Sequence, residues 1–459
     1  MERPVAWNTY DESALNALEA LSRRYRDYLN AGKTERECVT RTIEIARGAG
    51  YVSLEDRIRS GEKLRAGERI YSAVMGKAIM LFHIGESPLE KGVNIVGAHI
   101  DSPRIDLKQN PLYEEDGLAY LDTQYYGGIK KYQWVALPLA MHGVIVRIDG
   151  SVLNISIGEN EDDPVFCISD LLPHLADEQL KKNGETLIEG EALNLIIGGY
   201  PLPDTEKEPV KASILKLLKE KYGVEEEDFL SAELELVPAG KSRDMGLDGS
   251  MILGYGHDDR VCAYPSARAI LDYTGTPERT LCAVLTDKEE IGSVGATGMR
   301  SHYFENIVSE LYHCVGEYSE FGVKQALANS RMLSSDVSAA FDPNFASAFE
   351  KKNAAYLGCG VCFNKYTGGS GKHGSSDANA EFIGALRGIM QANDVTYQFS
   401  ELGKVDLGGG GTIAYMCAKY CMNVIDCGVP VLSMHAPWEV ISKVDLYEAY
   451  KCYCAFLKA

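Results

Sequence analysis

Long apolar runs are missing from this chain. No stretch of 18 or more apolar residues occurs among its 459 residues, so the sequence predicts no membrane-spanning helix. The first residues, MERPVAWNTYDESALN, have neither the basic start nor the apolar core of a secretory signal. We therefore expect a cytoplasmic protein without a membrane partner.

Positive charge is also scarce. The chain has 46 Lys and Arg against 66 Asp and Glu, which gives a formal net charge of −20. A nucleic acid or an anionic membrane needs a basic face to bind to, so we expect neither as a partner. Any anionic substrate would need a locally basic pocket.

A disulfide framework is absent as well. The 12 cysteines have no regular spacing, and in a reducing compartment they are expected to pack as small hydrophobic side chains. One CxxC pair, Cys359 and Cys362 in LGCGVCFNK, lies in a strand-like run and not at the loop-to-helix junction typical of a redox motif. We therefore favour a packing role for this pair. The sequence shows no internal repeat.

The size and composition that are present predict more than one globular domain. With 459 residues, 45% hydrophobic and 24% charged, the chain exceeds what one core usually supports, and two or three domains are expected. Between residues 105 and 241, short alternating segments such as GVIVRID and AELELVP predict a β-rich domain. This domain would be inserted into an α/β domain made of residues 1–104 and 242–459.

Sequence signals predict three helices in the α/β part. Apolar residues at helical spacing predict a helix over residues 12–30, and Thr34 with Glu37 forms a capping box for a second helix that ends near Gly48. A further helix is expected after GHDDR, where Pro265 should be tolerated only near the helix start.

The stretch TDKEEIGSVG holds two adjacent carboxylates, Glu289 and Glu290. It follows the apolar run 281–285, which is typical of a strand buried on both faces of an α/β sheet. Ligands of such sheets bind beyond the carboxyl ends of the strands. Because neighbouring side chains of an extended segment point opposite ways, the two carboxylates could have different roles. Taken alone, a solvated acidic turn is equally consistent.

Other strand-like runs also end in polar side chains. Ends of parallel strands that carry ligands converge on one edge of the sheet, so these side chains together predict a metal site, although each one alone would more often be a core or turn residue. The five runs end in His99 and Asp101, in Asp258 and Asp259, in Glu289 and Glu290, in Asp336, and in His435.

The donor types narrow the choice of metal. Two imidazoles and three carboxylates, without a thiolate, suit a pair of divalent ions such as Zn²⁺, Mn²⁺ or Co²⁺. Five side chains are too few for two separate complete shells. One carboxylate must therefore bridge the ions and waters must complete the shells, which leaves the open positions that hydrolytic two-metal sites use.

Five segments of the chain, in this order, resemble the signature segments of the M18 metallopeptidases, the aspartyl aminopeptidase family: GAHIDSPR, GHDDR, DKEEIGS, SSDVSAAFDPNF and SMHAPWE. The resemblance runs from about residue 93 to the C-terminus. It implies a mixed-sheet α/β catalytic domain of the dinuclear-zinc exopeptidase type, interrupted by a β-rich dimerisation domain, and self-association into a dodecamer. It also implies a peptide substrate from which an acidic N-terminal residue is released.

The resemblance further implies a ligand set for two metal ions, most simply Zn²⁺. One ion would be anchored by His99 and the other by His435. Asp258, the first Asp of GHDDR, would bridge both. Asp336 would complete the first of these sites and Glu290 the second.

By the same resemblance, Glu289 would be the general base and Asp101 would orient His99. A Glu290 carboxylate bound to a metal ion is not available to transfer a proton, which leaves Glu289 for this role. A histidine that binds a metal commonly donates its other ring N–H to a carboxylate, which fits Asp101. The chain departs from the family in Ile100, where many relatives have Thr, and in GHDDR, which replaces an LDN version. Neither change replaces a residue expected to bind a metal ion.

Substrate-binding residues are less closely defined. Tyr366 and Gly410 lie near positions that bind substrate in the family, and His174 of LLPHLA lies near the point where relatives supply a histidine across a subunit interface. An ordinary buried or capping histidine is an equal alternative for His174. For the whole protein, two other hypotheses are a dinuclear metal deacylase or carboxypeptidase of related architecture, and a self-assembling shell protein without activity.

Overall fold

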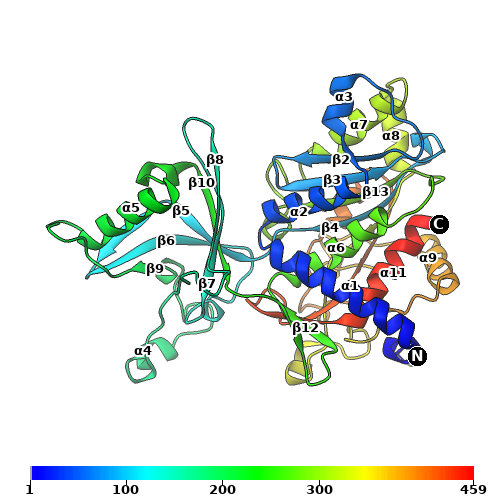
Figure 1. Ribbon diagram of the computed structural model, residues 1–459. Helices are drawn as coiled ribbons and strands as arrows, with labels where there is room; N and C mark the ends of the chain where they lie inside the picture. Colours follow the sequence, from blue (N-terminus) through cyan, green and yellow to red (C-terminus); the bar gives the residue numbers. More distant parts are fainter. Residues whose placement is uncertain (1–2) are drawn as a thin grey trace. The chain divides into compact units, whose positions relative to one another are not determined.

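The structure is a computed structural model that describes residues 3–459, and the chain forms two compact units (Figure 1). The first unit comprises Met1–Ser102, Ser242–Met434 and Glu439–Ala459. The second comprises Pro103–Lys241 together with His435–Trp438. The α/β character belongs to the first unit and an all-antiparallel sheet belongs to the second.

A nine-stranded mixed sheet forms the centre of the first unit. Its middle strands β13, β4, β14 and β18 run parallel to one another. In spatial order the strands are β1 (Val52–Ser53), β2 (Arg69–Val74), β3 (Ala78–His83), β13 (Leu281–Thr286), β4 (Asn94–His99), β14 (Arg331–Ser334), β18 (Asn423–Gly428), β16 (Val361–Asn364) and β17 (Tyr397–Ser400).

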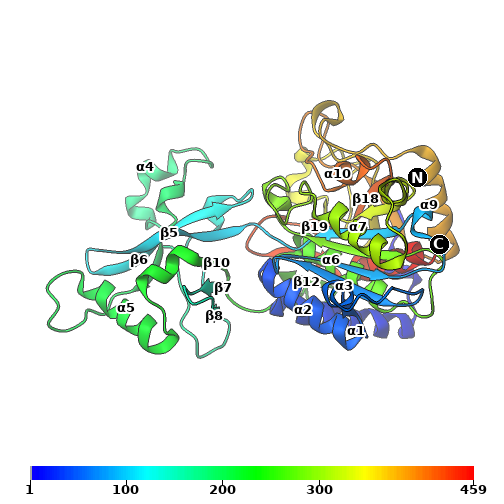
Figure 2. The same cartoon turned by 90° about the horizontal axis from the view of Figure 1, so that it is seen from above.

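Helices bury both faces of this sheet (Figures 1 and 2). Strand β13 shows the period of two: Leu281, Ala283 and Leu285 pack in one core, and Cys282 and Val284 in the other. Helices of the first core are α1 (Glu12–Ala31), α2 (Glu35–Gly48), α6 (His257–Leu271), α9 (Ala380–Ala392) and α11 (Lys443–Lys458). Helices of the second are α3 (Leu54–Ser60), α7 (Tyr303–Val315), α8 (Glu320–Ala328) and α10 (Ala414–Ala418).

The helix ends follow the sequence signals in part. The capping box is confirmed, because Thr34 Oγ1 accepts the Glu37 N–H and the Glu37 carboxylate accepts the Thr34 N–H. In α6, residues 258 and 259 have non-helical dihedral angles, so the regular helix begins at Arg260. Pro265 therefore lies beyond the first turn, and the expectation that it would be tolerated only near the helix start was wrong. Nearly all residues of α6 are buried, and this packing stabilises the helix although Pro265 has no backbone N–H to donate.

A separate five-stranded sheet takes up the end of the strand-like run that was expected to end in His435. The run, residues 423–434, divides into β18 of the large sheet and β19 of the small one, and Pro430, which has no N–H to donate, begins the new strand. The small sheet has the order β11 (Arg243–Met245), β12 (Met251–Gly254), β20 (Glu439–Ser442), β19 (Pro430–Leu432) and β15 (Ser338–Ala339).

The second unit is built on a six-stranded antiparallel sheet. Helix α5 (Pro209–Tyr222) contributes Ile214 and Leu217 to a mostly aliphatic cavity of about 540 Å³, which sheet residues Leu121 and Ile145 also line. The strand order is β8 (Val152–Ile157), β7 (Leu139–Val146), β10 (Ala232–Pro238), β5 (Arg104–Glu115), β6 (Leu118–Tyr126) and β9 (Leu195–Gly198). A short helix, α4, spans Asp177–Leu180.

Two expectations from composition can be compared with the structure. All 12 cysteines lie in the described part of the chain and are free, and most are buried, including both members of the CxxC pair. The packing role is therefore confirmed for the buried cysteines, including the CxxC pair, but not for Cys421, which is exposed. Among residues 3–459, no helix is both long and apolar enough to cross a membrane.

Candidate metal centre

The large sheet brings three of the five polar strand ends together. His99 is the last residue of β4, Glu289 and Glu290 follow β13, and Asp336 follows β14. These strands are parallel neighbours in the order β13, β4, β14, so their carboxyl ends lie at one edge. Asp258 follows β12, which belongs to the small sheet, so the argument from one parallel sheet was wrong for this residue.

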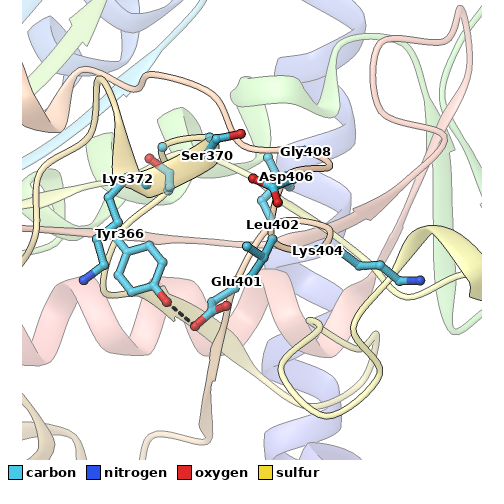
Figure 3. Close-up of a pocket in the computed structure, with 13 residues that line it drawn as sticks. Tyr366, Ser370, Lys372, Glu401, Leu402, Lys404, Asp406 and Gly408 are labelled. Carbon is cyan, nitrogen blue, oxygen red and sulfur yellow. Dashed lines mark hydrogen bonds between the residues drawn. The ribbon is translucent and has the colours of Figure 1, made fainter.

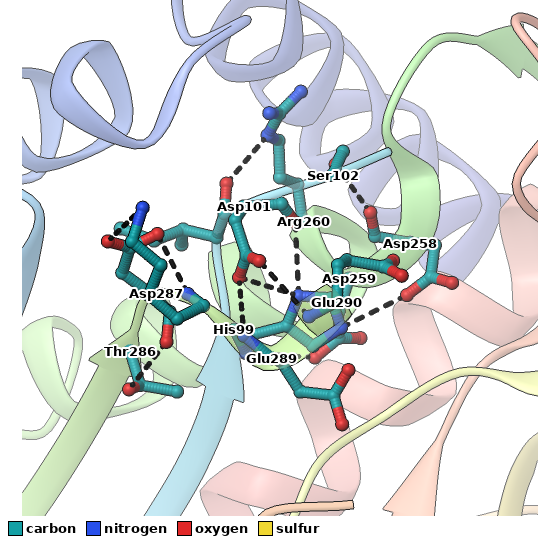
Figure 4. A network of polar contacts seen from close by, with 12 residues as sticks. His99, Asp101, Ser102, Asp258, Asp259, Arg260, Thr286, Asp287, Glu289 and Glu290 are labelled. Atoms are coloured by element: carbon teal, nitrogen blue, oxygen red, sulfur yellow. Dashed lines mark hydrogen bonds and ion pairs between the residues drawn. The ribbon is translucent and has the colours of Figure 1, made fainter. Parts of the chain in front are cut away.

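The gathered donors form one cluster, in which His99, Asp258 and Asp259 are buried and Glu289, Glu290 and Asp336 are partly exposed. Figure 4 shows the five of them other than Asp336. Three overlapping groups each place three ligand atoms within 4.8 Å of one another. The groups are His99 with Glu289 and Asp336, His99 with Asp258 and Glu290, and Asp258 with Asp259 and Asp336. Together the groups draw on six side chains.

His99 turns one ring nitrogen toward the carboxylates and the other toward Asp101. Its Nε2 lies 3.1 Å from Asp258 Oδ1 and 3.9 Å from Asp336 Oδ1. Its Nδ1 lies 3.0 Å from the carbonyl oxygen of Asp101 and 3.4 Å from Asp101 Oδ1. Burial lowers the pKa of His99, but the hydrogen bonds to Asp101 and Asp258 outweigh it and raise the pKa well above its ordinary value. The ring is thus held with Nε2 facing the cluster.

Asp101 also holds the turn that carries the two glutamates. Its Oδ1 accepts the Glu289 N–H and its Oδ2 accepts the Glu290 N–H, both at 3.2 Å. The glutamates lie in a 3₁₀ turn, Glu289–Ile291, preceded by Lys288 with φ of 68°. The expectation of an extended segment was therefore wrong. The two carboxylates still have different neighbours, because Glu289 groups with Asp336 and Glu290 with Asp258.

The structure adds residues that sequence reasoning gave no role. Asp259 is buried, and its Oδ2 accepts the His99 N–H at 3.2 Å. Burial raises its pKa well above the ordinary value. Ser102 Oγ donates to the carbonyl oxygen of Asp258 at 2.6 Å, and Glu439 Oε2 accepts the Asp258 N–H at 3.0 Å. The only signal in the sequence is their place inside or beside the GAHIDSPR, GHDDR and SMHAPWE segments.

The chemistry of the cluster fits divalent metal ions. Several carboxylates within 4.8 Å of one another repel when ionised. Burial and the charge of Glu289 raise the pKa of Asp336 well above its ordinary value, because ionising this carboxyl beside other carboxylates is unfavourable. A cation would relieve this repulsion. Oxygen and imidazole donors without thiolate match the ligands of catalytic zinc sites.

Two predicted site residues belong to the second unit. His435 lies in the segment His435–Trp438, and its Nδ1 is 2.9 Å from the carbonyl oxygen of Gly128 of the same unit. His174 is exposed in a 3₁₀ turn, Pro173–Leu175. Their positions relative to the cluster of the first unit stay predictions.

Tyr366 and Gly408, which is close to Gly410 in the sequence, line a cavity of about 220 Å³ in the first unit (Figure 3). The Tyr366 hydroxyl donates to Glu401 Oε1 at 2.5 Å, and Lys372 Nζ lies 4.0 Å from the centre of the Tyr366 ring. The Gly410 N–H donates to the carbonyl oxygen of Thr367 at 2.9 Å. The structure therefore brings these two segments together, while their role in substrate binding stays a prediction.

Comparisons with known proteins agree with one another. The family model described as "Aminopeptidase I zinc metalloprotease (M18)" matches residues 28–457. A probable M18 family aminopeptidase 1 of Clostridium acetobutylicum is 56% identical over 453 residues, which are 98% of this chain and 97% of the relative.

Solved structures show the same similarity. The crystal structure of an M18 family aminopeptidase from Thermotoga maritima matches with a TM-score of 0.94 and 42% identity, over 100% of this chain and 99% of that one. The mApe1 dodecamer of S. cerevisiae shares the fold, with a TM-score of 0.77 and 20% identity over 95% of this chain and 96% of that one.

Proposed function

Because the chain belongs to the M18 family of zinc metalloproteases and is an aminopeptidase, we propose that it releases acidic N-terminal residues from peptides at a dinuclear metal site. The observation that carries the dinuclear proposal is the overlap of the three donor groups through His99, Asp258 and Asp336. The hypotheses of a deacylase, a carboxypeptidase or an inactive shell protein are set aside, since the relatives are aminopeptidases.

In this proposal the metals are two Zn²⁺ ions, with Mn²⁺ or Co²⁺ as substitutes. His99 and Asp336 would hold one ion, Glu290 and His435 would hold the other, and Asp258 would be a ligand of both. The short distance of 3.1 Å between His99 Nε2 and Asp258 Oδ1 supports a shared ion at this end of the cluster.

The protein's own groups would divide the chemistry among them. When bound, the ions would polarise the scissile carbonyl and increase the acidity of a water molecule. Glu289 takes one proton from the attacking water and returns it to the amine that leaves when the C–N bond breaks. Asp101 keeps Glu289 in place through its backbone N–H and keeps His99 oriented through Nδ1.

Peptide recognition would use groups around the cluster. We assign Tyr366 and Gly410 to the substrate side of the first unit because they lie on segments that meet at one cavity. His174, exposed on the second unit, would reach the active site of a neighbouring subunit. Lys372 lies beside Tyr366 and is the kind of positive group that an acidic side chain requires, although it already pairs with Asp377 at 2.9 Å.

The assignment is tested by comparing Glu289→Gln with Glu290→Gln. We expect the first variant to keep its zinc and to lose turnover by about 100-fold or more, because only the proton transfer is removed. The second should lose zinc, as should Asp258→Ala. Zinc content by elemental analysis and initial rates on aspartyl, glutamyl, alanyl and leucyl chromogenic substrates separate the roles. Unchanged turnover of Glu289→Gln would refute the general-base assignment.

The same substrate panel tests specificity and metal use. Enzyme stripped by a chelator and resupplied with Zn²⁺, Mn²⁺ or Co²⁺ should regain activity, with aspartyl and glutamyl substrates cleaved fastest. Preference for leucyl or alanyl substrates would exclude the acidic specificity. Activity restored with one equivalent of zinc per chain, without further gain from a second, would exclude the dinuclear proposal.

Self-association is proposed through the second unit, which would act as the dimerisation domain and build a dodecamer. Large apolar side chains are exposed there, among them Ile148, Leu175, Tyr200 and Leu230. The fold relative mApe1 is a dodecamer, which supports the same assembly. Sedimentation of the wild type should give a mass near twelve chains, and Leu175→Glu should lower it. A wild-type monomer would contradict the proposal.

A further inference from the structure

Both main-chain polar groups of Asp258 are held by buried side chains of the first unit. The Asp258 N–H donates to Glu439 Oε2 at 3.0 Å. The carbonyl oxygen of Asp258 accepts the Ser102 hydroxyl at 2.6 Å, a contact drawn in Figure 4. Asp258 lies near the start of α6, but its φ of −79° and ψ of 106° are not those of a regular helix. Two side chains, those of Glu439 and Ser102, therefore help to hold its backbone.

Glu439 reaches Asp258 because of the small sheet. It is the first residue of β20, and the strand register pairs it with Gly254, the last residue of β12. The chain then continues from β12 through two residues to His257 and Asp258. The pairing of β12 with β20 thus places Glu439 beside the segment that leads to the ligand.

A carboxylate at this position is costly for the fold. Glu439 is only 1% exposed, and an ionised buried carboxylate loses its hydration next to a cluster that is already acidic. An apolar side chain would suit the packing of β20 better, but it would offer no acceptor oxygen. The presence of a glutamate here is explained if its oxygen is needed to accept the Asp258 N–H.

We propose that Glu439 is a positioning residue for the metal centre: it fixes the backbone of Asp258 so that the carboxylate stays directed at the ion shared with His99. Ser102 is the second anchor of the same residue. This inference rests on the proposed role of Asp258 as a metal ligand. The loss of a partner that orients a ligand typically weakens metal binding by about 10-fold to 100-fold.

The test compares three variants of the full-length enzyme in competition with a chelator for Zn²⁺. Glu439→Ala removes the acceptor and should weaken zinc binding by about 10-fold to 100-fold. Glu439→Gln keeps an oxygen that can accept the same N–H, so zinc affinity should stay within about threefold of the wild type. Glu448→Ala is the matched control, because Glu448 is also fully buried and its Oε2 accepts the Thr396 N–H at 2.8 Å. That variant should bind zinc as the wild type does.

Three results would overturn the proposal: wild-type zinc affinity in Glu439→Ala, a loss in Glu439→Gln as large as in Glu439→Ala, or an equal loss in Glu448→Ala. If Glu439→Ala does not fold, Glu439→Gln is compared with Ser102→Ala, which removes the other anchor and should also weaken zinc binding. Wild-type affinity in Ser102→Ala would then count against the proposal. Zinc retained by Asp258→Ala would instead show that the ligand assignment itself is wrong.

Discussion

Replacing Asp101 by Asn should damage the active site in two separable ways. The Asp101 carboxylate has two acceptor oxygens, and each accepts one N–H of the glutamate turn at 3.2 Å. Asn has one acceptor oxygen and one NH₂ donor, so either Glu289 or Glu290 must lose its acceptor. His99 Nδ1, 3.4 Å from Oδ1, loses a negatively charged partner as well.

The magnitude follows from these contacts. A hydrogen bond to a charged group contributes about 1.5 to 3 kcal/mol, and the length of 3.2 Å places each of these at the lower end. A loss of about 1.5 kcal/mol lowers the population of the correct turn by about tenfold. Loss of the partner of a ligating histidine adds about tenfold or more in metal affinity or activity. We therefore expect kcat/KM to fall by about 100-fold, with weaker zinc binding.

Asp445 offers a matched control for this variant. It is buried, and its two oxygens accept the N–H groups of Gly358 and Gly360, both at 2.7 Å. Burial raises the pKa of Asp445 to about 8, so the comparison is made at pH 9, where this carboxyl is also ionised. Asp445→Asn should lower the thermal midpoint without weakening zinc binding. Values of kcat/KM and zinc affinity within about twofold of the wild type in Asp101→Asn would refute the reasoning.

Three further predictions concern backbone space, pH and packing. In Gly428→Ala the new Cβ would overlap the main chain of Asp336, so zinc content and activity should fall, and wild-type zinc content would contradict this. Burial lowers the pKa of His83 to about 4, below its unfolded value of about 6.5. The folded state is therefore destabilised as the pH falls from about 6.5 towards 4. Between pH 7 and pH 5 the thermal midpoint of His83→Gln should drop less than that of the wild type. Leu18 is fully buried beside Val444, so Leu18→Ala should lower the free energy of unfolding by about 2 to 5 kcal/mol, measured by denaturant unfolding. Zinc affinity should stay unchanged, and a loss of zinc binding of the same size would show that the effect is not confined to the core.

Much of the first unit could be predicted from local signals. The strand before TDKEEIGSVG is a short apolar run because both of its faces are covered by helices, and its alternating side chains enter two different cores. The capping box at Thr34 uses only groups three residues apart, so its signal is complete within the sequence. The convergence of His99, Glu289 and Asp336 followed from the direction of parallel strands.

Other features depend on partners far away in the chain. Asp258 follows a strand of the small sheet, and what holds it in place is Glu439, 181 positions later, a contact that no local pattern encodes. The 3₁₀ turn at Glu289 needs Asp101, 188 positions earlier, to accept its N–H groups. The sequence by itself indicated which side chains are candidate metal donors, because donor types and strand ends are local properties. Only the tertiary structure decided how each donor is held, because that depends on hydrogen bonds between residues far apart in the chain.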